Sequence, residues 1–314
     1  MRQVVWITGI TGYSGRWLAR YIRDACPEAK ILGLARSPRF SGSGIDRYFQ
    51  LDLSDTDAII RTAKLMAPTV VFHLAALAPP APSPEMWRVN VGGTVNLLQG
   101  LRRAECLQAK IVCAGSAAEY LPSHDGLMSE KSPAGGANEY GRSKWAQTTL
   151  ALTLASQMGI RANIVRPYNI VGPNIPSRLV AGKICEQLFR TDNDEIHLGN
   201  TASERDFIDV RDLASAYWQV AIKGQPGQIY DVCSGVPTSI AELVKIFQHI
   251  AGVNKKVVSH DGPLAAVRPD RVYGQNHKIA SLEWKPVFSL EQSVADMLKA
   301  ARQAGAGRQQ PLAG

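Results

Sequence analysis

The chain has 314 residues, 45% of them hydrophobic and 20% charged, which is ordinary for a globular protein and enough for one large α/β domain or two units that share a core. Its net charge of +8 is not gathered into basic runs longer than the pairs Arg102-Arg103 and Lys255-Lys256, so we expect a small anionic ligand and no nucleic acid. Prolines break the apolar runs, no signal-peptide pattern opens the chain, and five scattered cysteines lack paired spacing, so we expect a cytoplasmic protein with no membrane contact, no disulfide and no metal.

Strand-like and helix-like segments alternate through the first half of the chain. The apolar run QVVWIT at 3–8 precedes a glycine turn and the segment YSGRWLARYI, whose apolar residues recur at helical spacing. The order then repeats, with strands expected at KILGLAR, TVVFHLAA, KIVCAGS and RANIVRP, and helices at DTDAIIRTAKLM, 84–106 and 138–158. We therefore expect an α/β fold of the Rossmann type, in which helices cover both faces of a doubly wound parallel sheet.

The second half of the chain is less regular. Helices are expected near 178–190, 239–251 and 290–302, with a strand at QIYDVCSG. We interpret residues 1–167 as the Rossmann domain, to which 206–235 returns. Residues 168–205 and 236–302 then form a smaller substrate-binding part, and 303–314 form a frayed tail.

A glycine-rich loop, TGITGYSG, joins the first strand to the first helix. Gly9, Gly12 and Gly15 would let the backbone turn tightly and approach a pyrophosphate, whose charge the helix N-terminus favours. Because the loop lies between a strand and a helix, we expect it to bind a dinucleotide, with Tyr13 and Ser14 as further members of the loop.

The end of the second strand indicates which dinucleotide is bound. An acid there would bind the 2'-hydroxyl of NAD, whereas this chain has Arg36 and Ser37. A guanidinium suits a 2'-phosphate, so we expect NADP(H), with NAD(H) as the alternative. Asp52 and Leu53 are candidates for adenine contacts, although Asp52 could equally begin the turn before the next helix.

Further motifs follow in a fixed order: HLAA, RVNVGGT, CAGSAAEYL and NEYGRSKWA. Together they resemble the extended short-chain dehydrogenase/reductase family over about residues 3–302. The resemblance implies a catalytic set of Ser116, Tyr140 and Lys144, in which the tyrosine transfers a proton and the lysine lowers its pKa and holds the nicotinamide ribose. A free phenol with a pKa near 10 is a poor base at neutral pH, which is why a neighbouring ammonium is useful.

The resemblance also implies further contacts and a partner. For the cofactor they are Leu74, Ala75, Ala76, Asn90, Tyr140, Lys144 and Pro167. In that family, the two helices expected here at 84–106 and 138–158 pair across a two-fold axis, which implies a homodimer through a four-helix bundle.

The resemblance narrows the reaction as well. Sugar-nucleotide dehydratases of the family carry an acidic pair where this chain has Ala117 and Ala118, so dehydration is not expected. The segments RPYNIVGPN, SERDFIDVRDLASAYWQV and RPDRVYGQNHKIASLEWKP look like those of the GDP-4-keto-6-deoxymannose reductases, which reduce a 4-keto sugar on a nucleotide. The substrate contacts implied are Ser116, Glu119, Asn169, Lys183, Arg205 and Arg268.

Two departures and two alternatives remain. Arg271 stands where the reductases usually have an acid that binds the nucleotide ribose, and Leu121 stands where a glycine usually follows the tyrosine. The same catalytic set could serve a 4-epimerase that keeps NAD tightly bound. An NADP-binding scaffold without turnover is the alternative of another class.

Overall fold

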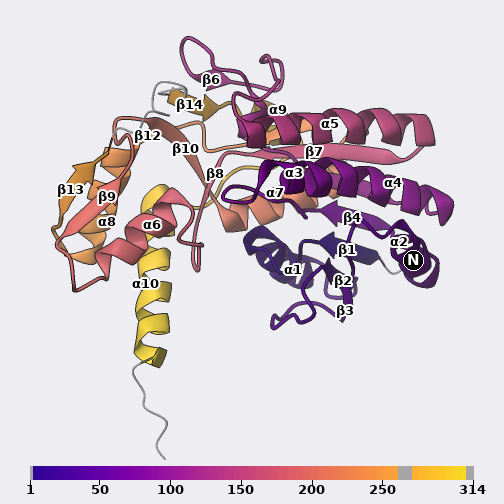
Figure 1. Ribbon diagram of the computed structural model, residues 1–314, viewed down its shortest axis with the longest axis horizontal. Coiled ribbons are helices and arrows are strands. Elements are labelled where there is room, and N and C mark those ends of the chain that lie inside the picture. The colour runs from indigo at the N-terminus through magenta and orange to yellow at the C-terminus, as the bar shows by residue number, and fades with distance from the viewer. Residues whose placement is uncertain (1–2, 261–270, 309–314) are drawn as a thin grey trace, which may run out of the picture.

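The computed structural model describes residues 3–260 and 271–308 (Figure 1). Its larger part is a seven-stranded sheet in the order β11-β7-β5-β4-β1-β2-β3, and every neighbouring pair is parallel. The strands are β1 (Val4–Thr8), β2 (Lys30–Ala35), β3 (Arg47–Gln50), β4 (Val70–His73), β5 (Lys110–Ala114), β7 (Arg161–Pro167) and β11 (Ile229–Val232). The doubly wound parallel sheet expected from the sequence is confirmed.

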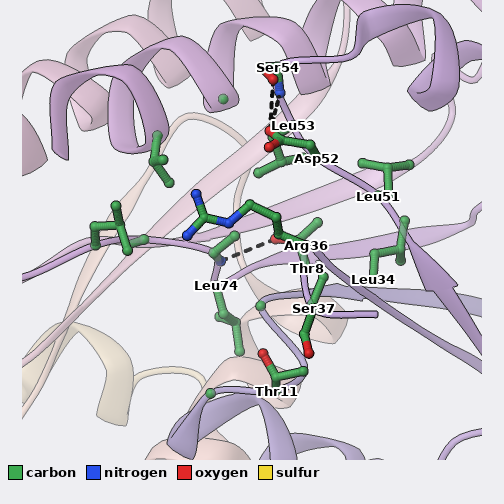
Figure 2. A pocket seen from close by; sticks show the side chains of 18 of the residues that line it. Thr8, Thr11, Leu34, Arg36, Ser37, Leu51, Asp52, Leu53, Ser54 and Leu74 are labelled. Carbon is green, nitrogen blue, oxygen red and sulfur yellow. Dashed lines mark hydrogen bonds between the residues drawn. The ribbon is translucent and has the colours of Figure 1, made fainter. Parts of the chain in front are cut away.

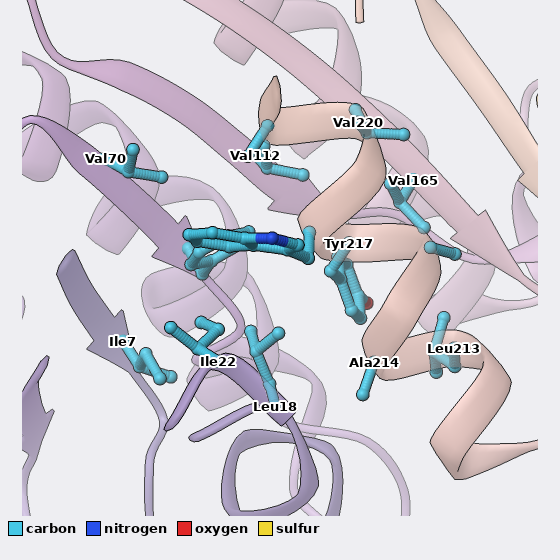
Figure 3. Packing of buried hydrophobic residues seen from close by; sticks show 14 of the residues in the cluster. Ile7, Leu18, Ile22, Val70, Val112, Val165, Leu213, Ala214, Tyr217 and Val220 are labelled. Carbon is cyan, nitrogen blue, oxygen red and sulfur yellow. The ribbon is translucent and has the colours of Figure 1, made fainter. Parts of the chain in front are cut away.

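Two groups of helices cover the two faces of this sheet (Figure 1). One group consists of α1 (Tyr13–Ala25) and α7 (Val210–Lys223), and the other of α2 (Thr56–Met66), α4 (Gly93–Arg103) and α5 (Glu139–Met158). Side chains of β1 alternate between them, because Val5 and Ile7 join the core under α1 and α7, shown in Figure 3, whereas Trp6 joins the core on the opposite face. All three are completely buried.

The smaller part is built around a second sheet. Its central strand, β10 (Glu204–Asp209), lies between β12 (Pro237–Ser239) and β14 (Arg271–Gly274). In addition, β8 (Asn169–Val171) pairs with β10, and β6 (Leu127–Met128) pairs with β14. A two-stranded sheet joins β9 (Glu195–Leu198) to β13 (Lys256–Ser259). The helices of this part are α6 (Val180–Leu188), α8 (Ile240–Ala251) and α10 (Leu290–Arg308), which share an apolar core. The short helix α9 (His277–Ala280) instead contacts β11 of the large sheet.

Several local expectations differ from this arrangement. The short strand β3 has no counterpart among the strands expected from the sequence. The helix expected at 84–106 is divided into α3 (Ser83–Trp87), a π-helical turn (Arg88–Gly92) and α4. In the segment 206–235, β10 pairs in the second sheet, β11 is a strand of the large sheet, and α7 packs on the face of the large sheet. The last helix continues to Arg308, beyond the expected end at 302. Across the described residues, no helix combines the length and apolarity needed to cross a membrane.

The buried side chain of Asp206 joins segments that are distant in the sequence. One oxygen accepts hydrogen bonds from Ser234 N and Ser234 Oγ, both at 2.8 Å, and the other accepts from Gly235 N at 2.8 Å and Gly274 N at 3.3 Å. The residue is completely inaccessible to solvent. This carboxylate therefore fixes the loop after β11 and the end of β14 against β10.

We expect Asp206→Ala to lower the free energy of unfolding by about 3 kcal/mol, because it leaves several buried N–H groups without an acceptor. Urea denaturation measures this loss. The control is Asp57→Ala on the exposed surface of α2, which should cost no more than about 1 kcal/mol. Equal losses in the two variants would contradict the joining role of Asp206.

Candidate active site

A cavity of about 550 Å³ lies at the carboxyl ends of β1 to β4, the edge where α/β sheets bind ligands (Figure 2). Nine of the residues expected to bind the dinucleotide line it: Gly9, Gly12, Arg36, Ser37, Asp52, Leu53, Leu74, Ala75 and Ala76. Three more members of the glycine-rich loop, Tyr13, Ser14 and Gly15, lie beside the cavity without lining it. The expected residues are therefore nine of the twenty that line this cavity.

The glycine-rich loop has no room for larger side chains. Gly9 has a φ of +71°, and a Cβ atom there would lie 2.8 Å from the backbone of Ala75. At Gly15 a Cβ atom would lie 2.6 Å from Gly9 O. Helix α1 begins directly after Gly12 and has no side-chain cap, so its first N–H groups can serve an anion. The loop thus fits a pyrophosphate.

The residues expected at the adenine end form a charged cluster. Asp52 accepts hydrogen bonds from Ser54 N at 2.8 Å and Ser54 Oγ at 2.9 Å, which begins the turn before α2. The Ser54 N–H is the largest cause that lowers the pKa of Asp52, and the charges of Arg88 and Arg36 act in the same direction. Asp52 therefore shapes the turn and also lines the cavity.

The structure gives Asn90 a supporting position. Its amide oxygen accepts from Leu77 N at 2.7 Å, and its amide nitrogen donates to Leu77 O and to Ser143 Oγ, both at 3.0 Å. It is completely buried and does not line the dinucleotide cavity. Asn90 joins the loop after β4 to α5 from within the π-helical turn, so the expected direct cofactor contact does not match this placement.

A second cavity, of about 390 Å³, lies between the large sheet and the second sheet. It brings together five residues that the sequence singled out: Ser116, Tyr140, Pro167, Asn169 and Arg205. The consecutive residues Leu77 and Ala78 line one cavity each, so the two spaces adjoin.

Ser116 and Tyr140 meet at the wall of this second cavity. Ser116 follows β5 and caps the 3₁₀ turn at Ala117–Glu119, and its side chain is near enough to Tyr140 to lower the pKa of the tyrosine. Helix α5 begins after Asn138, whose side chain accepts from Gly141 N at 2.9 Å, and Tyr140 therefore lies in its first turn.

The backbone of α5 passes very close to the Ser116 loop. A Cβ atom on Gly141 would lie 2.1 Å from Ala118 O, so only glycine allows this approach. The distance between the tyrosine and the serine is thereby set by main-chain contact.

Lys144 lies one turn further along α5 and is almost completely buried, at 1% exposure. Its Nζ donates to Ala114 O and Gln147 Oε1, both at 2.5 Å, and burial lowers its pKa to about 8. Burial raises the pKa of Tyr140, which the Ser116 hydroxyl and the charge of Arg178 partly offset. The lowering of this pKa by Lys144, which the family resemblance implies, stays a prediction.

Glu119 does not reach the second cavity and is completely buried. One carboxylate oxygen accepts from Ser116 N at 2.8 Å and Thr148 Oγ1 at 3.1 Å, and the other pairs with Arg166 at 2.7 Å. All its bonds are to the protein. The expected substrate contact is therefore replaced by a structural role, in which Glu119 supports the Ser116 loop.

The structure does not place the remaining expected substrate contacts, Lys183 and Arg268, on the second cavity. Lys183 is exposed on α6 and does not line the cavity. Arg268 lies outside the described residues. Arg271, which stands in place of the usual acid, forms an ion pair with Glu204 at 2.7 Å. Glu204 is the residue before Arg205 in the sequence.

Sequence reasoning missed three residues near the site. Arg88 lines the dinucleotide cavity and lies two positions before Asn90, so its place beside a recognised motif could have indicated it. Gln147 is three positions after Lys144, a helical spacing that brings their side chains together. Arg178, whose charge acts on Tyr140, lies in an irregular segment where no periodic pattern points to it.

We expect Glu119→Gln to lower the free energy of unfolding by about 3 kcal/mol, because it leaves the buried guanidinium of Arg166 without its counter-charge. Urea denaturation of Glu119→Gln, Arg166→Gln and the double variant measures the coupling. The free energy of unfolding should fall less in the double variant than the sum of the two single losses, by about 2 kcal/mol or more. Additive losses would show that the pair is not coupled.

The chain was compared with known proteins. The model of the NAD dependent epimerase/dehydratase family matches residues 5–233. GDP-6-deoxy-D-mannose reductase from Pseudomonas aeruginosa is 28% identical over an alignment that covers 95% of this chain and 97% of the relative.

Solved structures agree with this match. The structure of RMD from Pseudomonas aeruginosa complexed with NADPH superposes with a TM-score of 0.80 at 25% identity, covering 96% of this chain and 99% of that one. UDP-glucose 4-epimerase from Thermotoga maritima, with UDP-glucose, has the same fold, with a TM-score of 0.86 at 19% identity and coverage of 96% and 99%. The resemblance seen in the sequence is thus confirmed, and the chain belongs to the NAD dependent epimerase/dehydratase family.

Proposed function

We propose that the protein uses NADPH to reduce the 4-keto group of a nucleotide-linked 4-keto-6-deoxyhexose, with GDP-4-keto-6-deoxymannose as the first candidate. The observation that carries the proposal is that Ser116 and Tyr140 line one cavity together, and that this cavity adjoins the dinucleotide cavity. The similarity of nearly the whole chain to GDP-6-deoxy-D-mannose reductase supports this substrate class.

The residues along the first cavity fit a dinucleotide. The glycine-rich loop and the N-terminus of α1 would hold the pyrophosphate, Arg36 and Ser37 the 2'-phosphate, and Leu53 the adenine. Pro167, which lines the second cavity, would contact the nicotinamide end. Lys144 is buried and lines neither of these two cavities, and we keep it as a candidate for the nicotinamide ribose. When bound, NADPH supplies the hydride that is transferred to the carbonyl carbon.

The protein's own residues complete the reduction at the oxygen. Because burial raises the pKa of Tyr140, its hydroxyl stays protonated at neutral pH and can donate a proton to the carbonyl oxygen. Ser116 hydrogen-bonds the same oxygen and holds it in place. The carbonyl becomes a secondary alcohol, and Tyr140 regains its proton from solvent.

The second cavity suits a nucleotide diphosphate sugar. Asn169 and Arg205 line it, and the Asn169 side chain is held by a bond to Asp206 O at 3.2 Å. The guanidinium of Arg205 and the neighbouring charge of Arg178 would balance a diphosphate. We keep Lys183 and Arg268 as further candidates for the same group.

We expect the purified protein to consume NADPH when GDP-4-keto-6-deoxymannose is added, as measured by NADPH absorbance and by identification of the product sugar. Tyr140→Phe should lower kcat by a factor of about 100 or more, because it removes the proton donor and little volume. Thermal unfolding of the variant is the control for its fold.

Two outcomes would contradict the proposed reaction. A folded protein that leaves NADPH unchanged would exclude this substrate. Bound NAD that copurifies, together with sugar epimerisation without net cofactor use, would instead identify a 4-epimerase.

We also propose a homodimer in which α4 and α5 pair across a two-fold axis. Trp145 on α5 is 41% exposed and Trp87 on α3 is 36% exposed, so apolar side chains lie on this face. Sedimentation should give about twice the chain mass of 34.1 kDa. Trp145→Asp should shift the protein toward monomer, whereas Val287→Asp, an exposed position away from these helices, should leave the mass unchanged. A wild-type protein that sediments as a monomer would exclude the dimer.

A further inference from the structure

A carboxylate lies between two arginines at the adenosine end of the dinucleotide cavity. Glu85 Oε1 is 3.1 Å from Arg36 Nη1 and 3.8 Å from Arg88 Nη2. The three side chains are partly exposed, so the cluster is in contact with solvent and can rearrange. It joins the loop after β2 to α3 and to the π-helical turn.

Both arginines belong to the cavity wall. Figure 2 shows Arg36 extended across the cavity between Asp52 and Leu74. Arg88 also lines the cavity, and the charges of both arginines lower the pKa of Asp52. Two guanidinium groups therefore lie at this end with two carboxylates, Asp52 and Glu85, which leaves no excess positive charge.

A guanidinium offers a carboxylate the same N–H groups that it would offer a phosphate. A 2'-phosphate bound beside Arg36 would have to displace Glu85 from the arginine and would meet its negative charge. A 2'-hydroxyl carries no charge and would meet neither cost. Glu85 therefore weakens the binding of NADP(H) more than the binding of NAD(H).

We propose that Glu85 sets the preference between NADP(H) and NAD(H), by occupying the anion position between Arg36 and Arg88, and that Arg88 is a second ligand of the 2'-phosphate. This inference rests on the proposed function only in that a dinucleotide binds the first cavity. It does not depend on which sugar is reduced.

Glu85→Gln tests the proposal by direct binding. NADPH and NADH are titrated separately, without sugar, by isothermal calorimetry. We expect the NADPH dissociation constant to fall about fivefold, the size of one partly exposed charge interaction, and the NADH constant to change less than twofold. Because these charges are exposed, the difference should shrink at high salt.

Arg88→Gln tests the second part of the proposal. It should weaken NADPH binding about fivefold and leave NADH binding within twofold. The same substitution in the Glu85→Gln background should remove most of the gain, because the phosphate then has only Arg36.

Glu139→Gln is a matched control. Glu139 also lies in the first turn of a helix and pairs with an arginine three positions later, Arg142, at 3.3 Å. It contacts Ser83 and Trp87 but neither arginine of the cavity. It should leave the ratio of the NADPH and NADH constants unchanged, and thermal unfolding checks that each variant is folded.

The outcomes separate this inference from the proposed function. An unchanged ratio in folded Glu85→Gln, or an equal change in Glu139→Gln, overturns the role of Glu85. A wild-type protein that binds neither dinucleotide overturns both proposals. The expected change in the ratio, in a protein that does not reduce the 4-keto sugar, supports the role of Glu85 and rejects only the substrate.

Discussion

The arrangement of the active site depends on one buried ion pair, that of Glu119 with Arg166. The pair is almost inaccessible to solvent, and the carboxylate also accepts hydrogen bonds from the backbone before the 3₁₀ turn and from α5. A buried charge is tolerated only when its partners satisfy it, so these contacts must form together. As a result β7, the Ser116 loop and α5 are held at one point, next to Ser116 and Pro167, which line the second cavity.

The parts of the molecule that depend on local sequence patterns could be predicted from the sequence. The order of strands and helices in the large sheet and the glycine-rich loop after β1 depend on local patterns, and the structure has them where they were expected. Nine of the residues that line the first cavity were expected there as well. The meeting of Ser116 with Tyr140 was also expected, although from the family resemblance and not from spacing.

What could not be predicted depends on contacts between distant segments. Glu119 was expected to touch substrate from the family resemblance, but its carboxylate pairs with Arg166, which is 47 positions away. Asn90 was assigned to the cofactor by the same resemblance, and its partners Leu77 and Ser143 come from two other segments. The charge partners of Arg36 likewise depend on how α3 packs, which no local pattern reveals.

The close approach at Gly141 has a consequence for how such an enzyme can change over time. Because main chain lies against main chain there, a larger residue at position 141 would push apart the turns that carry Tyr140 and Ser116. The opposite wall of the second cavity comes from β10, β14 and the start of α6, which belong to a different sheet and core. Substitutions in that wall can therefore change the shape of the cavity without touching the contact that places Tyr140 beside Ser116.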